Sequence, residues 1–162
     1  MLTLPQYAKS VVTDESTPLS RQALSGFFDY LFNKPVPSGV SYFVIINLYG
    51  GTGSAINAQP PPTDPKSTSS YAHRHVGYVW QLYASTAAPP PPPGTGVVTF
   101  VEGMVASLGA EAKNLPAYAP YADPQLSRAD AQTRYWGASV PRLKTIKKAF
   151  DPKGILYNPQ GF

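Results

Sequence analysis

Only two segments of this chain have the pattern of β-strands, and that small number limits the folds that it can form. Residues 42–48 are apolar and rich in β-branched side chains, which favours a strand buried on both faces. Residues 76–84 alternate their side chains as a second strand does. Two or three strands cannot close a barrel or build a broad sandwich. We therefore expect part of a larger, mostly antiparallel sheet.

Two helical patterns accompany these strands. The first covers residues 17–32, where Thr17 supplies a capping hydroxyl and Pro18 suits the first helical position. Its apolar stripe follows helical spacing, with Leu24, Phe27, Phe28 and Leu31 at i, i+3, i+4 and i+7. A second apolar helix is expected over residues 95–108. The sequence thus predicts an α+β fold in which helices flank the sheet.

The C-terminal region predicts two short helices and an extended tail. Ser127 has the pattern of an N-cap, and Gly137 with Pro141 should interrupt the helix that it opens. A basic helix then ends at Phe150, before an Asp-Pro pair. Residues 155–162 are apolar and have no strand or helix partner of their own, so we expect them to pack poorly unless another domain covers them.

Composition restricts the class of protein. A chain of 162 residues with 43% apolar content suits one domain, whereas 14% charged content with 19 prolines and 13 glycines predicts long ordered loops. The net charge of +4 is concentrated in residues 142–148, as on a solvated helix face, so no nucleic-acid partner is expected. The absence of cysteine excludes disulfides and thiolate metal sites.

Three further patterns bear on targeting and linkers. No apolar run approaches the ~18 residues of a membrane span, so no membrane partner is expected. Pro5 and Lys9 interrupt the first segment, which therefore lacks the form of a secretion leader. Residues 89–93 form a polyproline run, for which a surface spacer is favoured over an SH3-type ligand.

Two motifs have a structural and a functional interpretation. The turn at Gly50-Gly51 could bind phosphate, but it lacks the ending of a P-loop and no strong helix follows, so a glycine turn is favoured. His73 and His75 could share a metal, yet no cysteine or carboxylate lies near enough in sequence to complete the site. A polar strand entry is favoured there, and no metal is expected.

The loop that contains Tyr118 and Tyr121 is the remaining candidate for chemistry. Two tyrosines in a proline-rich loop usually pack over the edge of a core. A tyrosine can instead act as a general base when a positive charge or an electron-poor cofactor lowers its pKa from about 10. The residues by themselves leave both possibilities open.

A wider resemblance covers residues 16–162. The chain closes on an ordered series of motifs: Tyr135-Trp136-Gly137, Arg142-Leu143, Ile146-Lys147, Asp151-Pro152 and Asn158-Pro159-Gln160. Together with the Tyr118-to-Asp123 loop, this series resembles the closing signature of the berberine bridge enzyme-like FAD-linked oxidases.

The resemblance implies a two-domain flavoprotein of which this chain holds the substrate side. Residues 1–126 would form part of the substrate-binding α+β domain, and residues 127–162 a helix and tail that pack on an FAD-binding domain absent from this chain. FAD would be bound mainly by that partner domain. The substrate would be a small hydroxylated molecule, a sugar or a secondary metabolite, oxidised by hydride transfer to the flavin. Family members are commonly secreted.

The resemblance also assigns roles to individual residues. Tyr118 would be the catalytic base and Asn47 would assist it. Gln81 and Tyr71 would bind substrate, while Tyr118, Tyr121 and Asn158 would contact the cofactor.

The chain departs from the family pattern at two positions in or beside this set of residues. Pro120 stands where the family loop usually has Asn, and Asn47 stands where relatives often have Asp. These departures, with the missing flavin half, leave a second hypothesis open: a non-catalytic fragment or binding domain.

Overall fold

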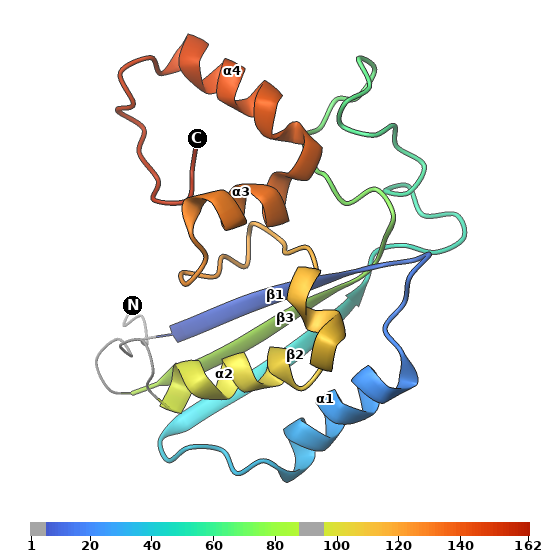
Figure 1. Cartoon of the computed structure of the whole chain (residues 1–162), viewed down its shortest axis with the longest axis vertical. Helices are drawn as coiled ribbons and strands as arrows, with labels where there is room; N and C mark the ends of the chain where they lie inside the picture. Colours follow the sequence, from blue (N-terminus) through green and yellow to red (C-terminus); the bar gives the residue numbers. More distant parts are fainter. Residues whose placement is uncertain (1–5, 88–95) are drawn as a thin grey trace.

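The computed structural model describes residues 6–87 and 96–162, and it confirms the α+β class (Figure 1). Three antiparallel strands form a sheet in the order β1-β3-β2, and α1 and α2 pack on one face of it. The elements are β1 Gln6–Asp14, α1 Arg21–Asn33, β2 Val40–Leu48, β3 Val76–Thr86, α2 Gly96–Ala106, η1 Gly109–Asn114, α3 Arg128–Trp136, η2 Gly137–Ser139 and α4 Val140–Phe150. The polyproline run at 89–93 lies outside the described residues.

The first strand was not predicted. β1 pairs with β3 along nearly its whole length, with Ser10 opposite Gln81. Its fourth residue, Lys9, is buried, and its ammonium group is paired with Glu102 and Asp123. Because a charged residue in the middle of a segment argues against a buried strand, the alternation around Lys9 gave too weak a signal.

Two expectations about neighbouring elements need correction. β2 is an edge strand and is not buried on both faces: Phe43 is 42% exposed and Ile45 41%. The helix α1 begins at Arg21, four residues later than expected, because Ser20 is its N-cap. The Ser20 hydroxyl accepts the backbone N–H of Ala23 at 3.1 Å, the role that the sequence had assigned to Thr17.

The two faces of the sheet differ in cover. On one face, Trp80 and Leu82 of β3 join Val11 of β1 in the core beneath Phe27 of α1 and Met104 of α2. The opposite face carries no helix from α1 or α2, and we call it the open face. It is formed by Ala8, Ser10 and Val12 of β1, Val79, Gln81 and Tyr83 of β3, and Phe43, Ile45 and Asn47 of β2.

The C-terminal helices follow the predicted boundaries. Ser127 caps α3 by accepting the N–H of Asp130 at 3.1 Å. Gly137 ends α3 with φ of +46°, a value that favours glycine, and Pro141 lies in the first turn of α4. The predicted end at Phe150 is confirmed. No helix in the described ranges is long and apolar enough to cross a membrane.

The tail is partly docked, which corrects the expectation that all of it packs poorly. Ile155, Leu156 and Tyr157 are at least 72% exposed, as predicted. The last residues instead return to α3, where the Gln132 amide donates to the carbonyl of Gly161 at 2.6 Å. The C-terminus therefore lies between α3 and α4 (Figure 1).

Candidate functional site

Four tyrosines gather at one end of the open face, and we call them the tyrosine cluster. Tyr118 is central: its ring centroid lies 5.3 Å from Tyr121, 6.0 Å from Tyr49 and 6.1 Å from Tyr71, each in an edge-to-face arrangement. The rings pack over a small apolar core that contains Val12 and Val79. Edge-to-face pairs of this kind hold rings in defined orientations.

The backbone around Tyr118 is fixed to β1. The N–H of Tyr118 donates to the Ser10 hydroxyl at 2.8 Å, and Ser10 lies on the open face. The N–H of Val12 donates to the carbonyl of Pro116 at 2.9 Å, so the loop runs along the outer side of β1. A third bond joins the N–H of Tyr121 to the carbonyl of Tyr118 at 2.9 Å.

Pro120 lies at the exposed tip of this loop. Its side chain is exposed at the tip of the turn, between the two tyrosines that pack together. The missing amide of the family's usual Asn therefore changes the outer surface of the turn, while the positions of Tyr118 and Tyr121 are kept by backbone bonds and ring packing.

Burial controls the phenols beside Tyr118. Desolvation raises the pKa of Tyr71 well above the ordinary value for tyrosine, and proximity to Tyr118 adds to this. Burial likewise raises the pKa of Tyr49, with Tyr118 as the second cause. The Tyr71 hydroxyl is buried and has no hydrogen-bond partner among the described residues. A buried hydroxyl without a partner is unfavourable, so a ligand that accepted from it would be bound more tightly.

Asn47 and Gln81 lie on the same open face as the cluster. Asn47 is opposite Val79 in β3, and Gln81 lies between Ser10 and Ile45 on the neighbouring strands. Both are half-buried, and neither side chain forms a hydrogen bond with another described residue. The structure thus brings together four predicted site residues, Asn47, Gln81, Tyr71 and Tyr118, with Tyr121 beside them.

Asn158 is the predicted site residue that lies apart from the cluster. It is exposed in the tail, where its side-chain oxygen accepts the N–H of Gln160 at 2.8 Å. It lines a hollow of about 410 Å³ together with Ala8 of the open face and Ala122, which directly follows Tyr121. Asn158 therefore lies beside the other end of the open face.

An ionic cluster supports the loop, and the sequence pattern did not reveal it. The Lys9 ammonium lies 2.7 Å from Glu102 and 2.9 Å from Asp123, which is almost fully buried. The Tyr7 hydroxyl bonds both carboxylates, and burial followed by these contacts raises the pKa of Tyr7. Lys9 itself, a lysine inside an alternating pattern, was the signal in the sequence that could have predicted this cluster. A lysine that is buried in a strand requires an acidic partner.

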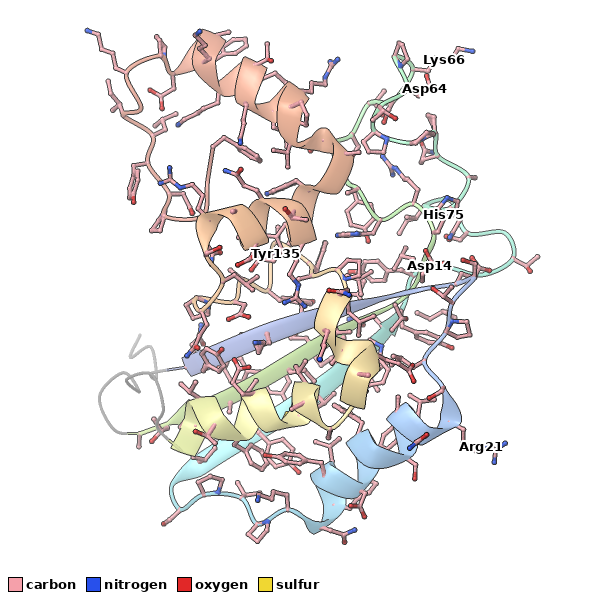
Figure 2. The ribbon with its side chains drawn as sticks, in the orientation of Figure 1. Asp14, Arg21, Asp64, Lys66, His75 and Tyr135 are labelled. Carbon is pink, nitrogen blue, oxygen red and sulfur yellow. The ribbon has the colours of Figure 1, made fainter. Side chains whose placement is uncertain are left out.

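Asp123 also joins the loop to the C-terminal region. Its backbone N–H donates to the Tyr135 hydroxyl of α3 at 2.8 Å; Figure 2 labels this side chain between α3 and the sheet. Its carbonyl accepts the Gln160 amide of the tail at 2.6 Å. One residue thus connects β1, the tyrosine loop, α3 and the tail.

The two histidines and the glycine turn take structural positions. His73 lies 2.9 Å through Nε2 from the carbonyl of Ala117, and desolvation lowers its pKa, whereas His75 is exposed. Within residues 6–87 and 96–162, no group of three or more His, Asp or Glu could hold a metal. Gly50 ends β2 in a turn, as predicted, and turns rather than a helix follow it.

Comparison with known proteins identifies relatives for the whole chain. Residues 117–162 match the family described as "Berberine and berberine like". The chain is 32% identical to the xylooligosaccharide oxidase of Thermothelomyces thermophilus over 160 residues, and 30% identical to the chitooligosaccharide oxidase of Gibberella zeae over 156. Each alignment covers 95% of this chain and 30% of the relative.

A solved structure shows the same arrangement of elements. The glucooligosaccharide oxidase of Acremonium strictum, described with a 6-S-cysteinyl, 8α-N1-histidyl FAD, superposes with a TM-score of 0.80 at 29% identity. The match covers 99% of this chain and 33% of that one. This chain therefore spans about 30% of the length of the curated relatives that it matches.

Proposed function

Because this chain is recognisable as part of a berberine bridge enzyme-like FAD-linked oxidase, we propose that its open face and tyrosine cluster form the substrate-side wall of the active site. The substrate would be a hydroxylated molecule, with an oligosaccharide as the first choice because of the relatives' names. One observation carries the proposal: Tyr118 is packed among phenols at the end of a face that also presents Asn47 and Gln81, whose side chains have no hydrogen-bond partner among the described residues.

The residues present fit a contact with the ring of a flavin, while most of the FAD would be held elsewhere. Tyr118 and Tyr121 would touch the ring, since a half-exposed aromatic pair suits a flat apolar partner. Asn158 would reach it from the neighbouring hollow. In the described part of the chain, no helix begins behind the glycine turn to receive a diphosphate. Bound FAD would supply the hydride acceptor.

Tyr118 would receive the proton of the substrate hydroxyl on its phenol oxygen. Tyr49 is suited to support this, because burial raises its pKa and keeps it protonated, so that its O–H can be donated to Tyr118. Hydrogen bonds donated to a phenolate favour the charged form. Tyr49 would thus stabilise the ionised Tyr118 that a general base requires.

The polar side chains of the open face would orient the substrate. Gln81 can both donate and accept, as the hydroxyl groups of a sugar require. Asn47 can also donate and accept. It lies nearer to the tyrosine cluster than Gln81 does, because it is opposite Val79, over which the tyrosines pack. The Tyr71 hydroxyl would find in the substrate the partner that it lacks among the described residues.

We also propose the division of the chain that the resemblance implied. Residues 1–126 would belong to the substrate domain, and residues 127–162 would pack on the FAD-binding domain. The exposed side chains of Ile155, Leu156 and Tyr157 support this, since they form an apolar segment that the rest of the described chain does not cover.

The test is Tyr118→Phe in an oxidase that joins this chain to a flavin domain. The change removes one hydroxyl and keeps the ring, so folding and flavin content should be unaffected. Flavin reduction by an oligosaccharide in stopped flow should slow about 10²–10⁴-fold, the usual effect of losing an acid–base group.

Tyr121→Phe is the matched control, because it removes a hydroxyl from the ring packed against Tyr118. It should slow reduction much less. Reduction of the Tyr118→Phe enzyme at the parent rate would show that Tyr118 is structural, and would favour the alternative of a binding domain.

A further inference from the structure

The loop that carries Tyr118 runs along the outer side of β1 and is attached to this strand at three places. At one end, the carbonyl of Pro116 accepts the backbone N–H of Val12 at 2.9 Å. At the other end, the carboxylate of Asp123 lies 2.9 Å from the ammonium group of Lys9. The third attachment is the hydroxyl of Ser10, which bonds the turn between these two ends.

The Ser10 hydroxyl bonds the main chain of both tyrosines in this turn. It accepts the backbone N–H of Tyr118 at 2.8 Å. Its own hydrogen can be donated to the carbonyl of Tyr118 at 3.2 Å or to that of Tyr121 at 3.3 Å. A serine hydroxyl has one donor and two acceptor lone pairs, so it can bond an N–H and a carbonyl at the same time. One side chain therefore holds both tyrosines at a defined distance from β1.

Burial makes these bonds specific. Ser10 is 3% exposed, so its side chain is almost completely shielded from water. A backbone N–H that is buried and loses its acceptor becomes unfavourable, because it has already lost its hydration. The turn should therefore keep the one position in which the N–H of Tyr118 reaches the Ser10 oxygen. Each of these bonds joins two residues of this chain, so none of them requires another domain.

The register of the sheet joins Ser10 to the proposed substrate wall. Ser10 is directly opposite Gln81 of β3, and both residues lie on the open face. Side chains at opposite positions of an antiparallel pair are immediate neighbours, with Cβ atoms about 4.5–5.5 Å apart. The residue that holds the Tyr118 turn is thus next to the amide that would orient the substrate. A movement of the turn relative to Ser10 would change the distance between the base and this amide.

We propose that Ser10 is the positioning residue of the Tyr118 base. This role rests on the proposed function and adds the group that sets the place of the base relative to Gln81. Ser10 is buried between β1 and the turn, so it acts through the backbone of Tyr118 and touches neither substrate nor flavin. Proton transfer requires that the base lie within hydrogen-bond reach of the substrate hydroxyl. A displacement of about 1 Å can slow a reaction about 10²-fold, so one buried hydroxyl can control the rate.

The experiment compares Ser10→Ala with Thr13→Val in an oxidase that joins this chain to a flavin domain. Thr13 is the matched control: it too is a 3% exposed hydroxyl residue of β1, but it accepts the N–H of Tyr78 in β3 at 3.1 Å. In stopped flow with an oligosaccharide, Ser10→Ala should lower the limiting rate of flavin reduction about 10–10²-fold. The half-saturating substrate concentration should change less than about twofold, because the lost contact matters only in the transition state. Thr13→Val should keep the parent rate, and both variants should keep their flavin.

The Tyr118→Phe background shows whether Ser10 acts through the base. In this background Ser10→Ala should slow flavin reduction less than about twofold further, because the phenol oxygen whose place it sets is already absent. An equal loss in both backgrounds would assign Ser10 to the general stability of the sheet and overturn the proposal. A Ser10→Ala enzyme that reduces its flavin at the parent rate would overturn it as well.

Amide hydrogen exchange in the 162-residue chain gives a second measurement that needs no flavin. Ser10→Ala should speed the exchange of the Tyr118 N–H at least about 10-fold, whereas Thr13→Val should speed that of Tyr78 and leave Tyr118 unchanged. Unchanged exchange at Tyr118 in Ser10→Ala would overturn the attachment itself. A parent rate of flavin reduction in Tyr118→Phe would instead overturn the assignment of the base, and with it the catalytic role of Ser10, even if exchange shows that Ser10 holds the turn.

Discussion

Asp123 shows how one buried carboxylate can determine the position of a loop. It is paired with Lys9 of β1 at 2.9 Å and accepts the Tyr7 hydroxyl at 3.1 Å. Its main chain bonds Tyr135 and Gln160. The loop that carries Tyr118 is therefore held on one side by a charge and on the other by helix and tail.

Asp123→Asn should destabilise the fold by roughly 3 kcal/mol, near the low end for removing one partner of a buried ion pair, since Glu102 still faces Lys9. Urea unfolding would measure the change. In the background of Lys9→Met the same substitution should cost less, giving a coupling above about 1 kcal/mol. Asp29→Asn, at an exposed carboxylate of α1, is the control and should change stability by less than about 0.5 kcal/mol. Additive effects of the two substitutions would contradict the pairing.

His73 should make stability depend on pH. Desolvation lowers its pKa in the folded protein below the ordinary value of 6.5. The folded state thus binds fewer protons than the unfolded chain, and stability falls as the pH drops. The free energy of unfolding should decrease as the pH falls below about 6.5, by no more than about 1.4 kcal/mol per pH unit.

The measurement is chemical unfolding at several pH values in the parent, in His73→Gln and in His75→Gln. His73→Gln should flatten the slope in this window, whereas His75→Gln, at an exposed position, should keep it. An unchanged slope in His73→Gln would assign the dependence to other groups.

At the scale of single residues, the structure places five residues that the sequence and the family resemblance had selected at the open face: Asn47, Tyr71, Gln81, Tyr118 and Tyr121. Asn47 and Gln81 are polar residues within apolar strands, a pattern that is visible in the sequence alone. The ion pair between Lys9 and Asp123 was not predicted, because its two members are 114 positions apart in the chain and no local pattern connects them. Contacts of that range depend on how the loop crosses β1.

Among the elements, helix ends were predicted better than strand environments. Ser127, Gly137 and Pro141 act through local backbone chemistry, and the structure has them in the expected roles. The prediction that β2 is buried on both faces was wrong, because an apolar run is compatible both with a buried strand and with an edge strand. Composition cannot distinguish these cases, since the difference lies in which strands are neighbours.

The turn after β2 depends on the absence of a side chain at Gly50. A Cβ there would lie 1.8 Å from the carbonyl oxygen of Val76, which belongs to the backbone of β3 and cannot move away freely. Gly50→Ala should therefore destabilise the protein by about 3 kcal/mol, the upper part of the range for overpacking.

Gly53→Ala provides the comparison for this turn. Gly53 has φ of +82°, and a Cβ at this position would meet no atom of the described residues within 4 Å beyond its chain neighbours. Alanine there should therefore cost only the backbone strain of about 1–2 kcal/mol. Thermal unfolding of both variants would show whether Gly50→Ala loses more stability than Gly53→Ala. Equal losses would mean that the contact with Val76 relaxes.

For the molecule as a whole, the uncovered part of the tail should matter only after assembly. Ile155→Ser/Leu156→Ser alters two side chains that are 77% and 76% exposed, so the stability of the chain alone should change by less than about 0.5 kcal/mol. In an oxidase with its flavin domain, each buried side chain would contribute roughly 1.5–3 kcal/mol. Comparing melting temperatures of the two forms tests this, and equal shifts would contradict the proposed docking.

The separation of the two sheet faces has a consequence for how such a protein can change. Along β2 and β3, positions that would meet the substrate alternate with positions that support the core. Substitutions at Phe43, Gln81 and Tyr83 can alter the chemistry of the wall while Trp80, Leu82 and Ala84 keep the helices in place. A scaffold with this period of two can change the residues of the proposed substrate wall through a few point mutations without first having to be stabilised.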